Sequence, residues 1–347
     1  MLTTLLTLSL TLSAFASPYK RDTSLSVSMS GPASDITSID DLKFTATVAN
    51  TGSESLKVFK YGMILDDILP THSFNVTKDG EIVLFTGVKP IFLWKDLNDS
   101  AFVVIPPRQS LTAEHDLSTL FDFASAGPGM FTFMPVTSFH MANPGEVSVT
   151  SRSINVNISG DMKKHDLPSL NRCAVDICTD NTKKNVINQS YTNAKSMASI
   201  ASSFISTNST SSVYTAYFST SPTSVVKGVF DNVANESSRT RTMDCSDPLN
   251  FCVTGAIAFT VFPSTNIYFC DSFFCYSPLT GLCDGTADQN ITRARITLHE
   301  FTHATSGTID VIYGCNNDQL LPAVEQPTNA DNYNCFASQV YQDTQCN

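Results

Sequence analysis

No cysteine occurs in the first 172 residues of this 347-residue chain. All ten come later, at Cys173, Cys178, Cys245, Cys252, Cys270, Cys275, Cys283, Cys315, Cys335 and Cys346. This distribution divides the chain near residue 170, and the length fits two domains better than one core. No pair has the CxxC spacing of a zinc ribbon or finger, so the even count predicts five disulfides in an oxidising compartment.

Long apolar runs are also scarce. Only residues 2–16, LTTLLTLSLTLSAFA, form an uncharged apolar run, and it ends in the small-x-small pattern of a signal-peptide cleavage site. The run is too short to span a bilayer, and no other stretch of about 18 apolar residues occurs. We expect residues 1–16 to be a signal peptide and the protein to be secreted, without a membrane anchor. Seven sequons suit a glycosylated surface: Asn75, Asn98, Asn157, Asn188, Asn208, Asn235 and Asn290.

Basic residues are outnumbered throughout the chain. It has 21 Lys and Arg against 32 Asp and Glu, a formal net charge of −11. From Cys173 onward there are 15 acidic and 8 basic residues. This balance does not suit nucleic-acid binding, whereas it could attract basic substrates.

The N-terminal half has the pattern of short β-strands. Stretches such as LSVSMS, FTATVAN, EIVLFTG and VSVTSRSINVNIS alternate polar and apolar residues or are rich in β-branched residues, and turn sequences separate them. We expect residues 17–172 to form an all-β, sandwich-like domain. It has no catalytic constellation, and His72, His115 and His140 are expected to be surface or packing residues.

A polar linker is expected at residues 160–172, GDMKKHDLPSLNR. It carries Lys163-Lys164, and a second basic pair, Lys20-Arg21, follows the signal peptide. In a secreted protein a basic pair in a linker can be a processing site, although a solvated connector is the commoner role of such a pair.

The C-terminal half, residues 173–347, mixes helices and strands. Apolar residues recur at spacings of three and four across residues 181–207, which predicts a long helix. Residues 250–270 indicate two strands around a turn at 263–266. Helices are predicted from near Thr286 to Ala304, ended by Gly307, and again around residues 329–338.

The densest group of chemically active residues is TLHEFTHATSGTIDVIYG, residues 297–314. His299 and His303 are four apart, so on a helix both imidazoles can face one metal ion, and zinc suits such ligands. Glu300 lies about 100° around the helix from His299, where it can reach a metal-bound water without binding the metal. The alternative is a helix with two partly exposed histidines and an ion-paired glutamate.

Several residues are candidates for a third ligand. The metzincin pattern HExxHxxGxxH is excluded because its Gly and His positions are Ser306 and Ile309. Glu325 lies between two prolines, off any helix that could present it. Asp310 follows a glycine turn that can bring the chain back to the histidines, although it could instead be a helix N-cap.

HEFTH followed by GTIDVIYG resembles the HExxH plus GTxDxxYG signature of the deuterolysin family, the aspzincin metallopeptidases. TNADNYNCF, residues 328–336, resembles that family's NADxY segment, and DCSDPLNFCVTGAIAFTVF resembles its Cys-rich strand region. The match covers most of residues 173–347. The whole layout is also similar, since such enzymes are made with a signal peptide and a β-rich propeptide. The resemblance implies an α+β zincin domain, mainly helical with a small β-sheet, after that propeptide.

The resemblance also implies roles for individual residues. His299, His303 and Asp310 would bind one zinc ion, and Glu300 would activate the attacking water and pass its proton to the leaving amine. Tyr313 would donate to the oxyanion, unless it is only a core aromatic residue. Asp331 would lie near the substrate, where it could favour Lys or Arg after the scissile bond, unless it is only a cap.

Further implications concern the disulfides and specificity. Cys173–Cys245 and Cys252–Cys270 are expected by resemblance, and the other pairings stay open. Asn334 stands where the lysine-specific branch has an acid, which puts strict lysine specificity in doubt. Residues 255–262 could offer a strand edge to an extended substrate, or could form an ordinary core hairpin.

The leading hypothesis is a secreted, monomeric zinc endopeptidase that acts on peptides or proteins and is made as a proenzyme. The β-rich propeptide would cover the cleft. Having no cysteine, it would act sterically or through another ligand such as His165 or a carboxylate. The alternatives are a secreted zinc-containing binding protein without catalysis and an uncleaved adhesion protein.

Overall fold

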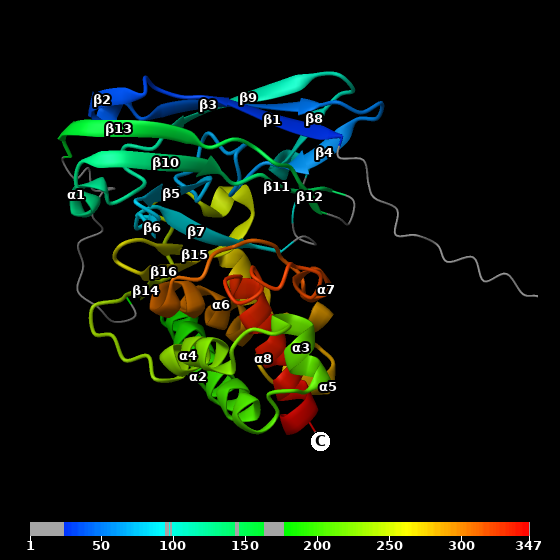
Figure 1. Ribbon diagram of the computed structural model, residues 1–347. Helices are drawn as coiled ribbons and strands as arrows, with labels where there is room; N and C mark the ends of the chain where they lie inside the picture. Colours follow the sequence, from blue (N-terminus) through cyan, green and yellow to red (C-terminus); the bar gives the residue numbers. More distant parts are fainter. Residues whose placement is uncertain (1–23, 94–96, 98, 143–145, 163–176, 347) are drawn as a thin grey trace, which may run out of the picture.

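The fold is α+β, as the computed structural model shows for residues 24–93, 97, 99–142, 146–162 and 177–346. Strands of the N-terminal half lie at one end of the molecule, and helices of the C-terminal half lie at the other, with a small mixed layer between them (Figure 1). The predicted signal peptide, both basic pairs, His165 and Cys173 lie outside these residues. Within them, no helix has the length and apolar character needed to cross a membrane.

Strands make up most of the N-terminal half. They are β1 (Leu25–Ser30), β2 (Asp35–Ser38), β3 (Lys43–Asn50), β4 (Leu56–Phe59), β5 (Phe74–Lys78), β6 (Glu81–Ile82), β7 (Val88–Phe92), β8 (Phe102–Ile105), β9 (Ser110–Asp116), β10 (Gly129–Pro135), β11 (Ser138–His140), β12 (Glu146–Ser148) and β13 (Ile154–Asp161), with the short helix α1 (Phe123–Ala126). One sheet has the order β1-β3-β9 and another β2-β13-β10-β5-β6, with two small pairs, β4-β8 and β11-β12.

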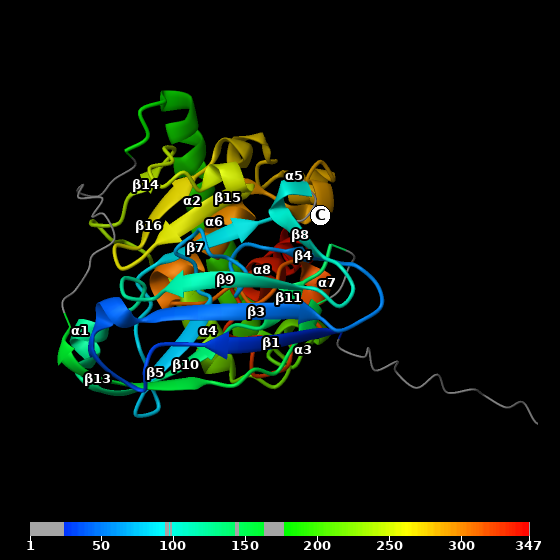
Figure 2. The ribbon, with the colours of Figure 1, turned by 90° about the horizontal axis from the view of Figure 1, so that it is seen from above.

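The two larger sheets pack face to face, and Figure 2 shows β1, β3 and β9 from above. Alternate side chains of β3 are buried, as expected for a strand with one solvent-exposed face. Phe44 of β3 contacts Phe74 and Phe133 of the other sheet, with ring centroids 5.4 and 4.8 Å apart. This agrees with the predicted sandwich-like arrangement.

The C-terminal half is mainly helical. Its elements are α2 (Asn181–Thr207), α3 (Ser212–Phe218), α4 (Thr223–Ala234), β14 (Met243–Asp244), β15 (Ala256–Val261), β16 (Asn266–Phe269), α5 (Gly281–Asp284), α6 (Arg293–Ser306), α7 (Cys315–Asp318) and α8 (Ala330–Gln345). The predicted helix at 181–207 and the two strands around the 263–266 turn are confirmed. Helix α6 starts later than expected, because Thr292 caps it by accepting from Arg295 N at 3.2 Å.

Strand β7 joins the two halves. It comes from the N-terminal half but completes the sheet β14-β16-β15-β7, in which it pairs antiparallel with β15 (Figure 1). The sequence predicts a strand at 81–87 instead, but only its first two residues, Glu81–Ile82, form a strand. Pro90 weakens the strand pattern of residues 88–92, because proline cannot donate a backbone hydrogen bond and is tolerated only at sheet edges. Strand β7 is such an edge strand. Buried side chains of both halves also form one continuous cluster.

Among the described residues of the C-terminal half, four disulfides form: Cys178–Cys245, Cys252–Cys270, Cys283–Cys346 and Cys315–Cys335. The expected Cys252–Cys270 bridge is confirmed, whereas the expected Cys173–Cys245 bridge is wrong. Ile177 N donates to Met243 O at 3.2 Å, which places Cys178, not Cys173, beside Cys245. Cys275 is exposed and forms no disulfide with another described residue.

Candidate active site

Helix α6 presents the HExxH residues from a buried position. Its residues from Ala294 to Ala304 are all buried between the sheet and helices α2, α4 and α8 (Figure 1). The helix ends at Gly307, whose φ of 70° is the left-handed conformation that glycine adopts without strain. The chain can therefore reverse directly after His303, as predicted.

The reversed segment is held in place by the start of α8. Ile309 N donates to Thr328 O at 2.8 Å, and Ala330 N donates to Ile309 O at 2.9 Å. Asn329 Oδ1 accepts from Val311 N at 2.9 Å. These bonds fix the short segment that carries Asp310, which is not a helix N-cap here.

The side chains of His299, His303 and Asp310 converge. Asp310 Oδ1 lies 2.9 Å from His299 Nε2 and 3.2 Å from His303 Nε2, and the two Nε2 atoms are 3.1 Å apart. His303 Nδ1 donates to Thr308 O at 2.7 Å, so its Nε2 is left without a proton when the imidazole is neutral. Glu325 is not among the ligand atoms that meet here.

These residues suit zinc chemically. Two imidazole nitrogens and one carboxylate oxygen are ordinary zinc ligands, and they leave a position open. Glu300 Oε1 is also buried without a hydrogen-bond partner, and Asp310 Oδ1 is buried beside only the two imidazole nitrogens. Buried oxygens in folded proteins normally have a partner, so Glu300 Oε1 favours a bound cation and its water at this point.

Burial and charge set the protonation of the neighbouring groups. Burial would raise the pKa of Asp310, but the adjacent histidines hold it well below its usual range, so the carboxylate stays ionised. Burial raises the pKa of Glu300 to about 8. Burial and the nearby negative charges raise the pKa of Tyr313 far above its usual value, so its hydroxyl keeps the proton.

Glu300 is held by a residue that the sequence did not single out. Thr260 of β15 donates its hydroxyl to Glu300 Oε2 at 2.6 Å, and both residues are fully buried. Glu300 Oε1 has no hydrogen-bond partner and is therefore the oxygen that can accept a proton from water. A threonine in a strand gives no sequence signal for such a contact, which depends on β15 packing against α6.

Tyr313 lies beside the three converging side chains and contacts the N-terminal half. Its ring is stacked near His299, with centroids 6.1 Å apart. Its hydroxyl donates to the backbone carbonyl oxygen of Pro90 in β7 at 2.7 Å. His72 and His140, expected to be surface or packing residues, line a cavity of about 30 Å³ together with Asp310 and Tyr313.

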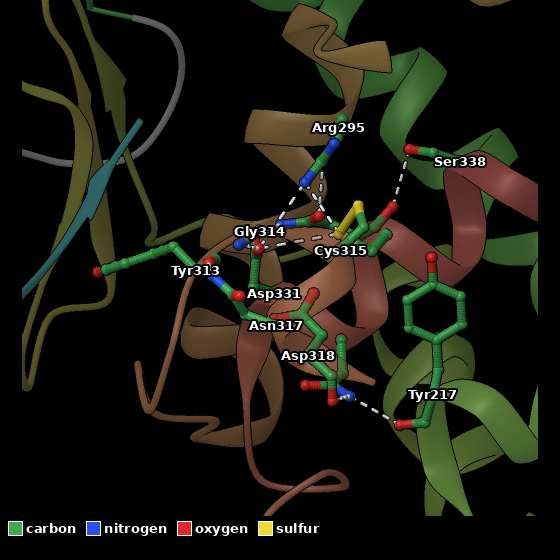
Figure 3. The surroundings of a disulfide bond; sticks show 12 residues. Tyr217, Arg295, Tyr313, Gly314, Cys315, Asn317, Asp318, Asp331 and Ser338 are labelled. Carbon is green, nitrogen blue, oxygen red and sulfur yellow. Dashed lines mark hydrogen bonds and ion pairs between the residues drawn. A yellow bond between two sulfur atoms is a disulfide. The ribbon is translucent and has the colours of Figure 1, made fainter. Parts of the chain in front are cut away.

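Asp331 is buried at the start of α8 (Figure 3). It accepts from Gly314 N at 2.6 Å and from Asn334 Nδ2 at 2.5 Å, and it lies 3.7 Å from Arg295 Nη2. Its Oδ1 is also 3.6 Å from His299 Nδ1. Figure 3 shows this group around the Cys315–Cys335 disulfide, with the Tyr313 side chain pointing away from it.

Comparison with known proteins gives the family. The profile of the Deuterolysin metalloprotease (M35) family matches residues 1–346. The chain belongs to this family. Penicillolysin from Penicillium citrinum is 30% identical, with 96% of each chain covered. Peptidyl-Lys metalloendopeptidase from Armillaria mellea is 27% identical, covering 90% of this chain and 91% of its own. A solved zinc peptidase from Grifola frondosa shares 19% identity and covers 46% of this chain and 96% of its own, with a TM-score of 0.38.

As a member of the deuterolysin family, the chain is a zinc-dependent metalloendopeptidase that hydrolyses peptide bonds in peptides or proteins. The family membership stated from the sequence motifs is confirmed. Bound zinc supplies a Lewis acid for this hydrolysis and makes water a better nucleophile near neutral pH.

The Thr260–Glu300 contact leads to a prediction. Thr260→Val should lower kcat about 10-fold or more, because a hydrogen bond to a charged group is lost, while zinc content stays unchanged. The bond lowers the pKa of Glu300, so its loss should move the acid limb of the kcat profile to higher pH. Thr254→Val is the control, since Thr254 donates only to Phe251 O among described residues. Equal kcat values for both variants would contradict the assigned contact.

Proposed function

We propose that this endopeptidase is made as a secreted proenzyme, in which residues 17–172 are a propeptide and residues 173–347 are the catalytic domain. The observation that carries the proposal is the position of β7. It occupies the edge of β15, and its Pro90 carbonyl accepts the hydroxyl hydrogen of Tyr313. A substrate strand would need the same edge and the same hydroxyl, so β7 excludes it.

Burial at the contact supports a steric block. All five residues of β7 are buried, and the cavity left between Asp310, Tyr313 and the N-terminal half is only about 30 Å³. That volume is close to the share of liquid water taken by one molecule. No peptide fits there until the N-terminal half has moved away.

In the proposed enzyme, His299, His303 and Asp310 hold the zinc ion. A hydrogen bond orients one of these ligands, since Thr308 O accepts from His303 Nδ1. Such an outer contact fixes the imidazole ring and strengthens it as a ligand. At His299, Asn334 Nδ2 lies 3.0 Å from Nδ1 and Asp331 Oδ1 lies 3.6 Å from it.

Glu300 and Tyr313 are the proposed catalytic residues. Glu300 takes a proton from water as it adds to the substrate carbonyl carbon, then gives the proton to the nitrogen as the C–N bond breaks. The Tyr313 hydroxyl donates to the oxygen that gains negative charge. The products are a carboxylic acid and an amine, between which the second proton of the water then passes, and Glu300 returns to its starting state.

Asp331 stays a prediction as a substrate contact. A carboxylate near the cleft could attract a basic side chain, as Lys and Arg residues after the scissile bond would provide. In the present conformation its oxygens are already shared with Gly314, Asn334 and Arg295.

Secretion is supported by the disulfides and by the sequons. Among the described residues four disulfides are present, and such bonds form and persist in oxidising compartments. Most sequon asparagines in the described ranges are exposed, as glycosylation requires: Asn75, Asn188, Asn208, Asn235 and Asn290.

The test compares the full chain with chain cut in the linker between residues 162 and 177. The full chain should be nearly inactive on casein and histones, and cutting followed by release of the N-terminal half should raise activity at least about 100-fold. A zinc chelator should abolish that activity, and added zinc should restore it.

Two outcomes would contradict the proposal. An uncut chain as active as the cut one would refute the blocking role of residues 17–172. A cut, zinc-loaded chain with no activity would instead favour the alternative of a zinc-containing binding protein.

A further inference from the structure

Strand β7 also shows how an extended peptide can lie in the cleft, which bears on substrate preference. Its register against β15 pairs Val88 with Val261, Lys89 with Thr260 and Pro90 with Phe259. Thr260 is the residue that contacts Glu300, so this register brings the peptide past the proposed base.

The Tyr313 hydroxyl defines which peptide bond occupies the reacting position. It donates to Pro90 O at 2.7 Å, and a carbonyl oxygen held in this way belongs to the bond between Pro90 and Ile91. Counting back from that bond, Pro90 is the first residue on its amino side, Lys89 the second and Val88 the third.

The ammonium group of Lys89 is bound by groups of the C-terminal half. Lys89 is 6% exposed, and its Nζ donates to Thr308 O at 2.7 Å and Gly307 O at 3.3 Å. The ammonium also lies 4.7 Å from the ring centroid of Phe262. Among described residues, no carboxylate lies within salt-bridge distance of it, and the negative charge of Asp310 acts on it from farther away. Backbone carbonyls and an aromatic face make the direct contacts with the charge.

The site suits a primary ammonium for physical reasons. Gly307 ends α6, and a helix C-terminus carries partial negative charge on its carbonyl groups. An aromatic face attracts a cation within about 6 Å. The two carbonyl groups and the aromatic ring stay with the enzyme once the N-terminal half is gone, because Gly307, Thr308 and Phe262 all belong to the C-terminal half.

Val88 lies on the opposite face of β7. It belongs to a buried apolar cluster whose other buried members come from the C-terminal half: Phe251, Phe259, Val261, Tyr268 and Cys270. Leu69 of the N-terminal half packs against the edge of this cluster. An apolar side chain at the position of Val88 is therefore favoured, because it buries its own apolar surface and that of the surrounding cluster.

We propose that the cleft has a lysine-binding site formed by Gly307, Thr308 and Phe262, which selects substrates with lysine as the second residue before the cleaved bond. An apolar residue precedes that lysine. The inference rests on the proposed function, and it identifies the substrates as lysine-containing, extended segments of proteins. Lys89 of the N-terminal half occupies the same site until it is released.

The test is the cleavage-site profile of the cut, zinc-loaded enzyme on casein and histones, read by mass spectrometry. Lysine should be enriched at the second position before the cleaved bonds. In matched peptides that differ only there, norleucine in place of lysine should lower kcat/KM about 10- to 100-fold, as expected for losing hydrogen bonds from a charged group.

A variant of the site gives a second measurement. Phe262→Leu keeps an apolar side chain but removes the aromatic face, so it should reduce the preference for lysine over norleucine about 2- to 30-fold. Its kcat/KM for the lysine peptide should fall by more than its kcat/KM for the norleucine peptide. Casein hydrolysis without lysine enrichment, or equal rates on the two peptides, would overturn the lysine site and leave the proposed function standing. No hydrolysis of any substrate would instead refute the proposed function.

Discussion

Glu300→Gln should lower kcat about 10²- to 10⁴-fold, because glutamine cannot accept a proton from water. The substitution keeps the size of the side chain, and Thr260 can still donate to the amide oxygen that replaces Oε2. Glu300 is fully buried and burial raises its pKa to about 8, which brings a carboxylate near the range where a base works at neutral pH. Hydrolysis of casein by the cut chain, at saturating zinc, measures the effect.

The control for Glu300→Gln is a glutamate-to-glutamine substitution outside the site. Glu325→Gln alters the other glutamate considered as a metal ligand, which is not part of the converging group. It should leave kcat unchanged. Metal analysis should find the same zinc content in both variants, and a Glu300→Gln enzyme with undiminished kcat would exclude Glu300 as the base.

Asp310→Asn should remove most of the zinc along with the activity. The carboxylate oxygen of Asp310 lies within 3.2 Å of both imidazole nitrogens, and the amide that replaces it carries no charge to attract a cation. We expect zinc affinity to fall at least about 100-fold. At a zinc concentration that saturates the unaltered enzyme, this loss corresponds to about 2.7 kcal/mol less stabilisation by zinc.

Zinc titration followed by thermal unfolding measures the loss, with metal content as a second readout. Asp343→Asn is a matched control, because Asp343 is exposed at the end of α8. Full zinc content in the Asp310→Asn variant would show that the third ligand is another residue. A variant that simply fails to fold would show no cooperative thermal unfolding at any zinc concentration in the same titration.

The proposed site could be predicted largely because its signals are local. Two histidines one helical turn apart, a glycine that ends the helix and an aspartate three residues later are all contained in 297–314. Helix periodicity and the left-handed preference of glycine determine how such a segment folds. The structure brings those same side chains together within hydrogen-bonding distance of one another.

Contacts between distant segments could not be predicted in this way. Thr260 and Glu300 are 40 residues apart, and Lys89 and Thr308 are 219 apart. No sequence pattern predicts contacts at such separations, because strand pairing depends on tertiary packing rather than on local propensity. For the same reason the Cys178–Cys245 bridge was not predicted.

The pairing of β7 with β15 has a consequence for biosynthesis. The N-terminal half leaves the ribosome first, and domains generally fold in that order during synthesis. Strand β7 is therefore already available as a template when β15 emerges about 170 residues later. Without it, β15 would be an edge with unpaired backbone groups, which other chains could join. By pairing with β15, strand β7 would thus also keep other chains from joining this edge while the protein folds.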